Sequence, residues 1–351
     1  MKTPKVVLEL NPTASNPRNS EGSIIELEDG RLMFAYSHFY GGAADDAPAF
    51  IGARFSADRG QSWDREDTIL VQNEVQNVMS VSFLRLNTRE IGLFYLLRYS
   101  LQDLRMVISK SRDEGKTWSE PRLCMAEPGY YVVNNDRIIQ LADGKILIPA
   151  ALHPCTDGTW ETWQPKARAS CFFSDDGGAT WSCSKALEAP KESGSGLQEP
   201  GIIQLPDGTV MLWARTDLGS QYIAFSKDGG CTWSQSEPSD LLSPLSPASI
   251  KRIPSTGEYL CLYNDHSGRF SFVPGKRTPL VAARSRDGIT WYGHKLVEGD
   301  PDGWYCYTSI SFVDDNVLLG YCAGDSQVGG LNRLRLTRVP LSWLLEGGGH
   351  D

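Results

Sequence analysis

Apolar runs recur along the chain in pairs that are joined by a short polar turn. In the clearest copies, at residues 23–39, 136–152 and 200–216, the turn contains an Asp-Gly pair. Asp-Gly between two apolar runs is the strongest short-range signal for a β-hairpin, because the tight turn needs positive φ. Looser copies of the pattern occupy residues 80–97, 248–263 and 309–322. The pattern therefore predicts six hairpins along the chain.

After each of the first five hairpins, a third apolar run leads into a polar box of serine, aspartate, glycine and tryptophan in fixed order. The boxes occupy residues 56–63, 111–118, 174–181, 226–233 and, shortened by one residue, 285–291. The aspartate can accept hydrogen bonds from turn N–H groups, the glycine permits a left-handed conformation, and the tryptophan can pack against the sheet. We therefore predict that the boxes stabilise the turns between third and fourth strands and carry no chemistry.

Repeats of four strands predict an all-β fold, namely a six-bladed β-propeller of four-stranded antiparallel blades. The prediction takes residues 1–351 as a single catalytic domain, a length that large all-β domains reach. The last repeat has neither a box nor an obvious outer strand. We expect the apolar N-terminal run at residues 5–10 to supply that strand and to close the ring.

The net charge and the cysteines limit the binding partners and the cellular compartment that we expect for this protein. A net charge of −9 argues against general attraction to nucleic acid or to anionic membrane surfaces. The eight cysteines form no CxxC pair and several lie in apolar runs, which indicates buried thiols and favours a reducing compartment. Because the N-terminus lacks the apolar run of a signal peptide, we expect a cytoplasmic protein, or an exported one whose leader is absent from this sequence.

The repeated boxes, spread over the whole chain, resemble those of the sialidase (neuraminidase) superfamily of six-bladed propellers. The resemblance implies a retaining exo-α-sialidase that releases terminal sialic acid, or another nonulosonic acid, through a tyrosyl–sugar intermediate. It implies no cofactor, and a sialylated glycan or another acidic carbohydrate as the partner. In that family three arginines bind the substrate carboxylate, a tyrosine with a glutamate partner is the nucleophile, and an aspartate is the acid and base.

Two residues of the fourth hairpin match this set. Glu199 lies at the start of its first strand and Arg215 at the end of its second. Since these two positions lie side by side in a hairpin, we expect both residues to project into the central funnel. The resemblance makes Glu199 the base for the tyrosine and Arg215 one of the three arginines. Arg277, before the third strand of the fifth repeat, is the next arginine, with Lys276 as the weaker candidate.

The sixth hairpin supplies the tyrosine. Tyr307 immediately precedes the innermost strand and is the nucleophile that the resemblance implies. Tyr305, two residues earlier on the same side of an extended chain, is the alternative.

The first repeat should supply the remaining arginine and the acid. Arg18 precedes the innermost strand, but the Ile-Pro that usually follows this arginine in the family is absent, and Glu21 could point into the funnel instead. The loop after the second strand holds Asp45 and Asp46 among glycine and alanine, which suits a loop that closes over a site. We prefer Asp46 slightly over Asp45 as the acid and base.

Other polar residues are expected at the funnel mouth, where they would contact hydroxyl or N-acyl groups: Asn77, Asn135 and Asp136. Histidines end the second strands of alternate repeats, at His38, His153 and His266. Their separation argues against a metal site, and we predict none.

Two other functions stay open. The same fold resembles exo-arabinan hydrolases and some polysaccharide lyases, so the substrate could be another acidic sugar or arabinan. A carbohydrate-binding propeller without turnover is the third possibility. Loss of Tyr307 or Glu199 would favour it, and both residues are present.

Overall fold

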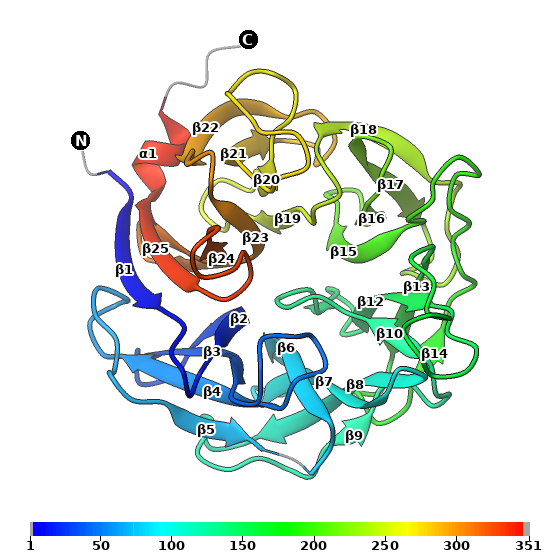
Figure 1. Ribbon diagram of the computed structural model, residues 1–351, viewed down its shortest axis with the longest axis horizontal. Helices are drawn as coiled ribbons and strands as arrows, with labels where there is room; N and C mark the ends of the chain where they lie inside the picture. The colour runs from blue at the N-terminus through cyan, green and yellow to red at the C-terminus, as the bar shows by residue number, and fades with distance from the viewer. Residues whose placement is uncertain (1–2, 73, 347–351) are drawn as a thin grey trace.

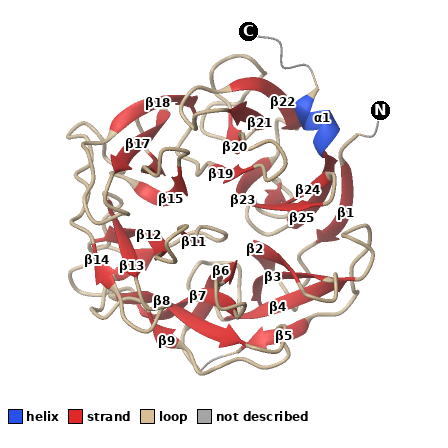
Figure 2. Cartoon of the chain, turned by 180° about the vertical axis from the view of Figure 1, so that it is seen from behind, coloured by secondary structure: helices blue, strands red, loops and turns tan. Residues whose placement is uncertain are grey.

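The structure, a computed structural model, describes residues 3–72 and 74–346. Almost all of its regular elements are strands of antiparallel sheets. The sheets surround a common centre (Figure 1), and Figure 2 shows the same arrangement from the opposite face. The expected all-β fold of four-stranded antiparallel sheets, with little helix, is confirmed; in one region two repeats share a larger sheet.

Three sheets follow chain order from the innermost strand outward. The first consists of β2 (Arg18–Glu26), β3 (Leu32–Phe39), β4 (Ala49–Ser56) and β5 (Thr68–Val71). The next consists of β15 (Gln198–Gln204), β16 (Val210–Arg215), β17 (Ser220–Ser226) and β18 (Glu237–Leu242). The third consists of β19 (Ser249–Arg252), β20 (Tyr259–Asn264), β21 (Leu280–Ser285) and β22 (Tyr292–Glu298).

The second and third repeats share one nine-stranded sheet. Its strands are β6 (Asn77–Arg85), β7 (Ile91–Ser100), β8 (Asp103–Ser111), β9 (Arg122–Leu123), β10 (Tyr130–Val132), β11 (Ile139–Gln140), β12 (Ile146–His153), β13 (Arg168–Ser174) and β14 (Ser182–Cys183). A single parallel pair, Tyr130 with Leu104, joins the two repeats. Both β10 and β11 pair with β12, so the inner strand of the third hairpin is interrupted between them.

The last sheet combines both ends of the chain. Its order is β1 (Lys5–Leu10), β25 (Leu334–Pro340), β24 (Asn316–Gly324) and β23 (Trp304–Val313), and α1 (Leu341–Leu345) follows β25. The N-terminal run is therefore the outer strand of this sheet, paired antiparallel with β25. Within the described ranges, no helix has the length and apolar character needed to cross a membrane.

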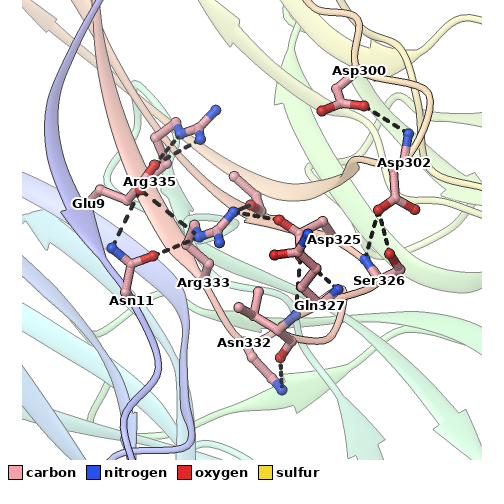
Figure 3. A network of polar contacts seen from close by, with 12 residues as sticks. Glu9, Asn11, Asp300, Asp302, Asp325, Ser326, Gln327, Asn332, Arg333 and Arg335 are labelled. Carbon is pink, nitrogen blue, oxygen red and sulfur yellow. Dashed lines mark hydrogen bonds and ion pairs between the residues drawn. The ribbon is translucent and has the colours of Figure 1, made fainter.

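A polar network fastens β1 to the last hairpin (Figure 3). Arg335 Nε donates to Glu9 at 2.9 Å, and Arg333 Nε donates to Asn11 at 2.7 Å. Arg333 also donates to Asp325 at 2.8 Å. These contacts hold the connection between β24 and β25, which reaches the central cavity described below.

The five boxes have the structure expected from their residue types. In the box at 226–233, Asp228 accepts from Ser226 Oγ at 2.7 Å, from Thr232 N at 2.9 Å and from Thr232 Oγ1. Gly229 and Gly230 both have positive φ, which matches the left-handed turn. Trp233 packs, partly buried, against the cluster that contains Leu212. The box joins β17 to β18 on the outer side of the sheet.

We expect Asp228→Ala to lower the free energy of unfolding by roughly 1 kcal/mol, because the box donors lose their acceptor. Urea denaturation would measure this, with the exposed neighbour Lys227→Ala as the control. Equal midpoints for the two variants would contradict the structural role of the box. The hydrogen bonds from Thr232 lower the pKa of Asp228 from 3.8 to about 2. The stability that the charged Asp228 adds to the folded state is therefore fully present above pH 3.8 and is lost as the pH falls towards 2.

Candidate active site

Four innermost strands carry a β-bulge near the centre of the molecule. The register shifts between Ser20 and Ser23 in β2, Met79 and Ser82 in β6, Gln198 and Gly201 in β15, and Cys306 and Ser309 in β23. Within each bulge one non-glycine residue has positive φ: Glu21 (59°), Ser80 (57°), Glu199 (46°) and Tyr307 (58°). Bulges redirect side chains, and such backbone conformations cost about 1–3 kcal/mol each. All four residues line one cavity of about 260 Å³.

Tyr307 and Glu199 meet inside this cavity. The phenol Oη of Tyr307 donates to Glu199 Oε1 at 2.9 Å. Burial, and then the negative charge of Glu199, raise the pKa of Tyr307 well above its usual value, so the phenol is neutral in the resting site. The pair has the geometry for proton transfer from tyrosine to carboxylate. The alternative tyrosine, Tyr305, instead packs in the core beside Tyr321.

Arg215 lies on the other side of Glu199. Its NH1 is 2.9 Å from Glu199 Oε2, an ion pair without the angles of a hydrogen bond. Gln198 Oε1 accepts from Nε and NH2 of Arg215 at 3.0 and 2.8 Å. Gln198 and Arg215 are register partners at the ends of β15 and β16, so the hairpin brings the arginine and the glutamate together.

Arg277 forms the wall next to the tyrosine. Its guanidinium carbon lies 5.4 Å from the ring centroids of both Tyr307 and Trp304. Its buried NH1 has no hydrogen-bond partner within the described ranges. Lys276 instead donates to Asp302 at 2.6 Å, at the surface network where Asp302 also accepts from Ser326 (Figure 3). The structure thus places Arg277, and not Lys276, in the cavity.

Arg18 is buried behind two carboxylates. Its NH1 donates to Asp45 Oδ1 at 2.6 Å and its NH2 to Glu21 Oε1 at 3.3 Å. Asp45 and Glu21 line the cavity, whereas Arg18 itself does not. Asp46 is half-buried and also lies outside the cavity lining, so the geometry favours Asp45 of the two loop aspartates.

The cavity lining also contains residues that were not expected at the site from the sequence. Arg98, near the end of β7, donates from NH1 to Tyr130 Oη at 2.9 Å, and its buried Nε has no partner in the described part. His153 stacks on Trp163 at 4.7 Å, and burial lowers its pKa to about 4, so it is neutral. Exposed Trp160 lies at the rim. Arg98 lies near the end of a second hairpin strand, opposite the first residue of the inner strand, as Arg215 does. This shared position is the signal that could have identified it.

Three other expected site residues lie outside the cavity lining. Asn77 donates to the carbonyl of Ala47 beneath the loop. Asn135 donates to the carbonyls of Gly22 and Tyr307, and so ties two bulges together. Asp136 accepts from Ile310 N and pairs with Lys251. Asn135 and Asp136 thus support the inner strands, whereas Asn77 supports the loop between β3 and β4.

The other two histidines that end second strands make contacts within the protein. His38 pairs with Asp67, and His266 contacts the carbonyl of Thr278. Among residues 3–72 and 74–346, no three His, Cys, Asp or Glu side chains are grouped so as to hold a metal ion.

Glu21 should titrate near neutrality. Burial raises its pKa from 4.5 to about 7, although Arg18 and Ser80 act in the opposite direction. The folded state therefore binds this proton more tightly than the unfolded chain, so Glu21 makes the wild type lose stability as the pH rises from 4.5 to 7. We expect Glu21→Gln to remove this slope. Thermal unfolding from pH 4 to 8 would measure it, with exposed Glu120→Gln as the control; parallel curves for wild type and Glu21→Gln would contradict the assignment.

Comparison with known proteins agrees with the fold. The model of the BNR repeat-like domain family matches residues 30–320. The sialidase of Bacteroides fragilis (strain YCH46) is 21% identical over 333 residues, covering 84% of this chain and 58% of its own length. The sialidase of Micromonospora viridifaciens is 27% identical over 371 residues, covering 96% of this chain and 54% of its own length. The chain thus spans little more than half of these relatives.

Among solved structures, the leech intramolecular trans-sialidase complexed with 2,7-anhydro-Neu5Ac superposes with a TM-score of 0.75. It is 15% identical and covers 98% of this chain and 71% of its own, so the likeness is one of fold. Because the family model matches most of the chain, this protein belongs to the sialidase superfamily of BNR-repeat proteins.

Proposed function

We propose that this protein is a retaining exo-α-sialidase that releases terminal sialic acid, or a related nonulosonic acid, from glycoconjugates. The observation that carries the proposal is the buried hydrogen bond of 2.9 Å between Tyr307 and Glu199, beside the unpartnered NH1 of Arg277. The repeated strand order and the pairing of β1 with β25 support counting the fold as a six-bladed propeller that this pair closes.

Four arginines in or behind one small cavity favour an acidic sugar over neutral arabinan. These are Arg18, Arg98, Arg215 and Arg277, in a chain whose net charge is −9. A planar guanidinium binds a carboxylate through two parallel hydrogen bonds. Among the described residues, NH1 of Arg277 has no hydrogen-bond partner, so it can donate to such a carboxylate.

The first step transfers the sugar to the protein. Tyr307 Oη attacks the anomeric carbon while its proton moves to Glu199, and the bond to the leaving oxygen breaks. Asp45 gives its proton to that oxygen. A neutral phenol suits this attack because the anomeric carbon of a sialic acid carries a carboxylate, which would repel an anionic nucleophile.

The second step returns the protein to its starting state. Asp45, now a carboxylate, takes a proton from water, and the hydroxide attacks the anomeric carbon. The bond to Tyr307 Oη breaks, and the phenolate recovers its proton from Glu199. Two displacements at the same carbon give retention of configuration.

Turnover of the 4-methylumbelliferyl α-sialoside of N-acetylneuraminic acid tests the proposal. We expect release of the fluorophore by the wild type, and a fall in kcat of about 10²–10⁴-fold for Glu199→Gln, because the tyrosine loses its base. Tyr307→Phe should lose the reaction, whereas Tyr305→Phe, which changes a core tyrosine outside the cavity, should retain it. Absence of release by the wild type between pH 4 and 8 would reject the proposal.

The first sugar released should be the α-anomer of the free acid. Proton NMR during the first minutes of turnover distinguishes this anomer from the β-anomer, since mutarotation is slower. A β-anomer would contradict the double displacement. A product lighter by one water would instead indicate intramolecular transfer, in which a hydroxyl of the same sugar replaces water.

A further inference from the structure

Each nitrogen of the Arg18 guanidinium already donates a hydrogen bond to the protein. Its Nε donates to Ser20 Oγ at 3.2 Å, and its NH1 donates to the carbonyl of Ala43 at 3.2 Å as well as to Asp45. Its NH2 donates to Glu21. Because only 1% of Arg18 is exposed, a substrate carboxylate cannot reach it unless one of these partners leaves.

The two carboxylates on Arg18 differ in how firmly they are held. Glu21 is buried, lies within the bulge of β2 and also accepts from Ser80. The side chain of Asp45 is 54% exposed and lies on the loop between β3 and β4. Asp45 can therefore leave Arg18 by a local movement of an exposed loop, whereas Glu21 cannot leave without disturbing the sheet.

Resting on the proposed function, we propose that the carboxylate of the substrate takes the place of Asp45 on Arg18, and that the released Asp45 turns to the leaving oxygen. Substrate binding and the positioning of the acid are then one event. The exchange conserves charge at Arg18, because one carboxylate replaces another. Asp45 thus serves both as the acid and as the group that occupies the arginine in the absence of substrate.

Electrostatics in the resting site support such an exchange. Burial by itself would raise the pKa of Asp45, but Arg18, and more weakly Arg98 and Arg277, hold it below 3.8. The charged and titratable groups that face Asp45 are Arg18, Arg98, Arg277, Glu21 and Tyr130. While it is paired with Arg18, Asp45 is a poor proton donor at neutral pH. Loss of this partner and the arrival of a second carboxylate both raise the pKa of Asp45 towards the range that an acid catalyst needs.

Inhibition by 2,3-didehydro-N-acetylneuraminic acid, which carries the carboxylate but cannot be cleaved, tests the exchange. We expect Asp45→Asn to lower the inhibition constant at pH 7 by about tenfold, because the inhibitor no longer competes for Arg18. Binding by calorimetry gives the constant for variants that have lost turnover. The neighbour Asp46→Asn is the matched control and should bind as the wild type does. The methyl ester of the inhibitor should bind equally to all three proteins.

Equal or weaker binding of the free acid by Asp45→Asn would overturn the exchange, as would equal tightening by Asp46→Asn. A second measurement does not depend on variants for its readout: carbon NMR of protein labelled at the aspartate carboxyl, with Asp45→Asn used only for assignment. We expect the Asp45 resonance to titrate at higher pH when the inhibitor is bound, by at least one pH unit. An unchanged or lower midpoint would overturn the exchange.

Failure of this proposal can be told from failure of the proposed function. Turnover of the sialoside with an unchanged midpoint for Asp45 would reject the exchange and leave the sialidase proposal intact. No turnover, together with no binding of the inhibitor to wild type or variant, would reject both.

Discussion

The burial of positive charge at the centre of an acidic chain is the constraint on which the site depends. An arginine removed from water is costly unless its donors are satisfied and its charge is balanced. The structure meets this demand with carboxylates from the same sheet as each arginine: Glu199 for Arg215, and Glu21 with Asp45 for Arg18. Arg277 and Arg98 are different, because each has a buried nitrogen without a hydrogen-bond partner in the described part and each guanidinium lies over an aromatic ring. The cavity is therefore balanced in charge at Arg18 and Arg215 and can still bind an anion at Arg98 and Arg277.

The bulges explain how such groups can be aimed at one point. In a regular strand, successive side chains alternate between the two faces of the sheet and pack between neighbouring sheets. A bulge inserts an extra residue, and its left-handed backbone turns that one side chain out of the alternation. The strain is tolerated because antiparallel pairing continues on both sides, as β23 and β24 show from Trp304 to Val313. Glu21, Ser80, Glu199 and Tyr307 owe their positions to this device.

Much of the fold could be predicted from the sequence because its signals are local. Asp-Gly turns mark the hairpins, and each box reports a turn through hydrogen bonds within eight residues or fewer. Glu199 and Arg215 could be placed together for the same reason, since hairpin pairing relates the start of one strand to the end of the next. The shared sheet of the second and third repeats could not be predicted, because it depends on one contact between Tyr130 and Leu104.

The parts of the site that could not be predicted depend on contacts between residues far apart in the sequence. Asn135 and Asp136 have the polarity of ligand-binding residues, but they bond to backbone groups of neighbouring inner strands. The choice between Asp45 and Asp46 depends on where Arg18 draws the loop, and no local pattern encodes that distance.

Charge balance also bears on the order in which a substrate would engage the arginines. Arg277 can accept a carboxylate without exchanging a partner, since its guanidinium lies over the ring of Tyr307 and its NH1 has no hydrogen-bond partner in the described part. Arg215 cannot exchange its partner without removing Glu199 from Tyr307, and that carboxylate is needed as the base. Arg18 can exchange, because the aspartate that covers it lies on an exposed loop. A substrate carboxylate would thus meet Arg277 first and Arg18 second, while the pair of Arg215 and Glu199 stays intact throughout. The same anion that is drawn in by one arginine would then release the acid from another, and a neutral sugar would do neither.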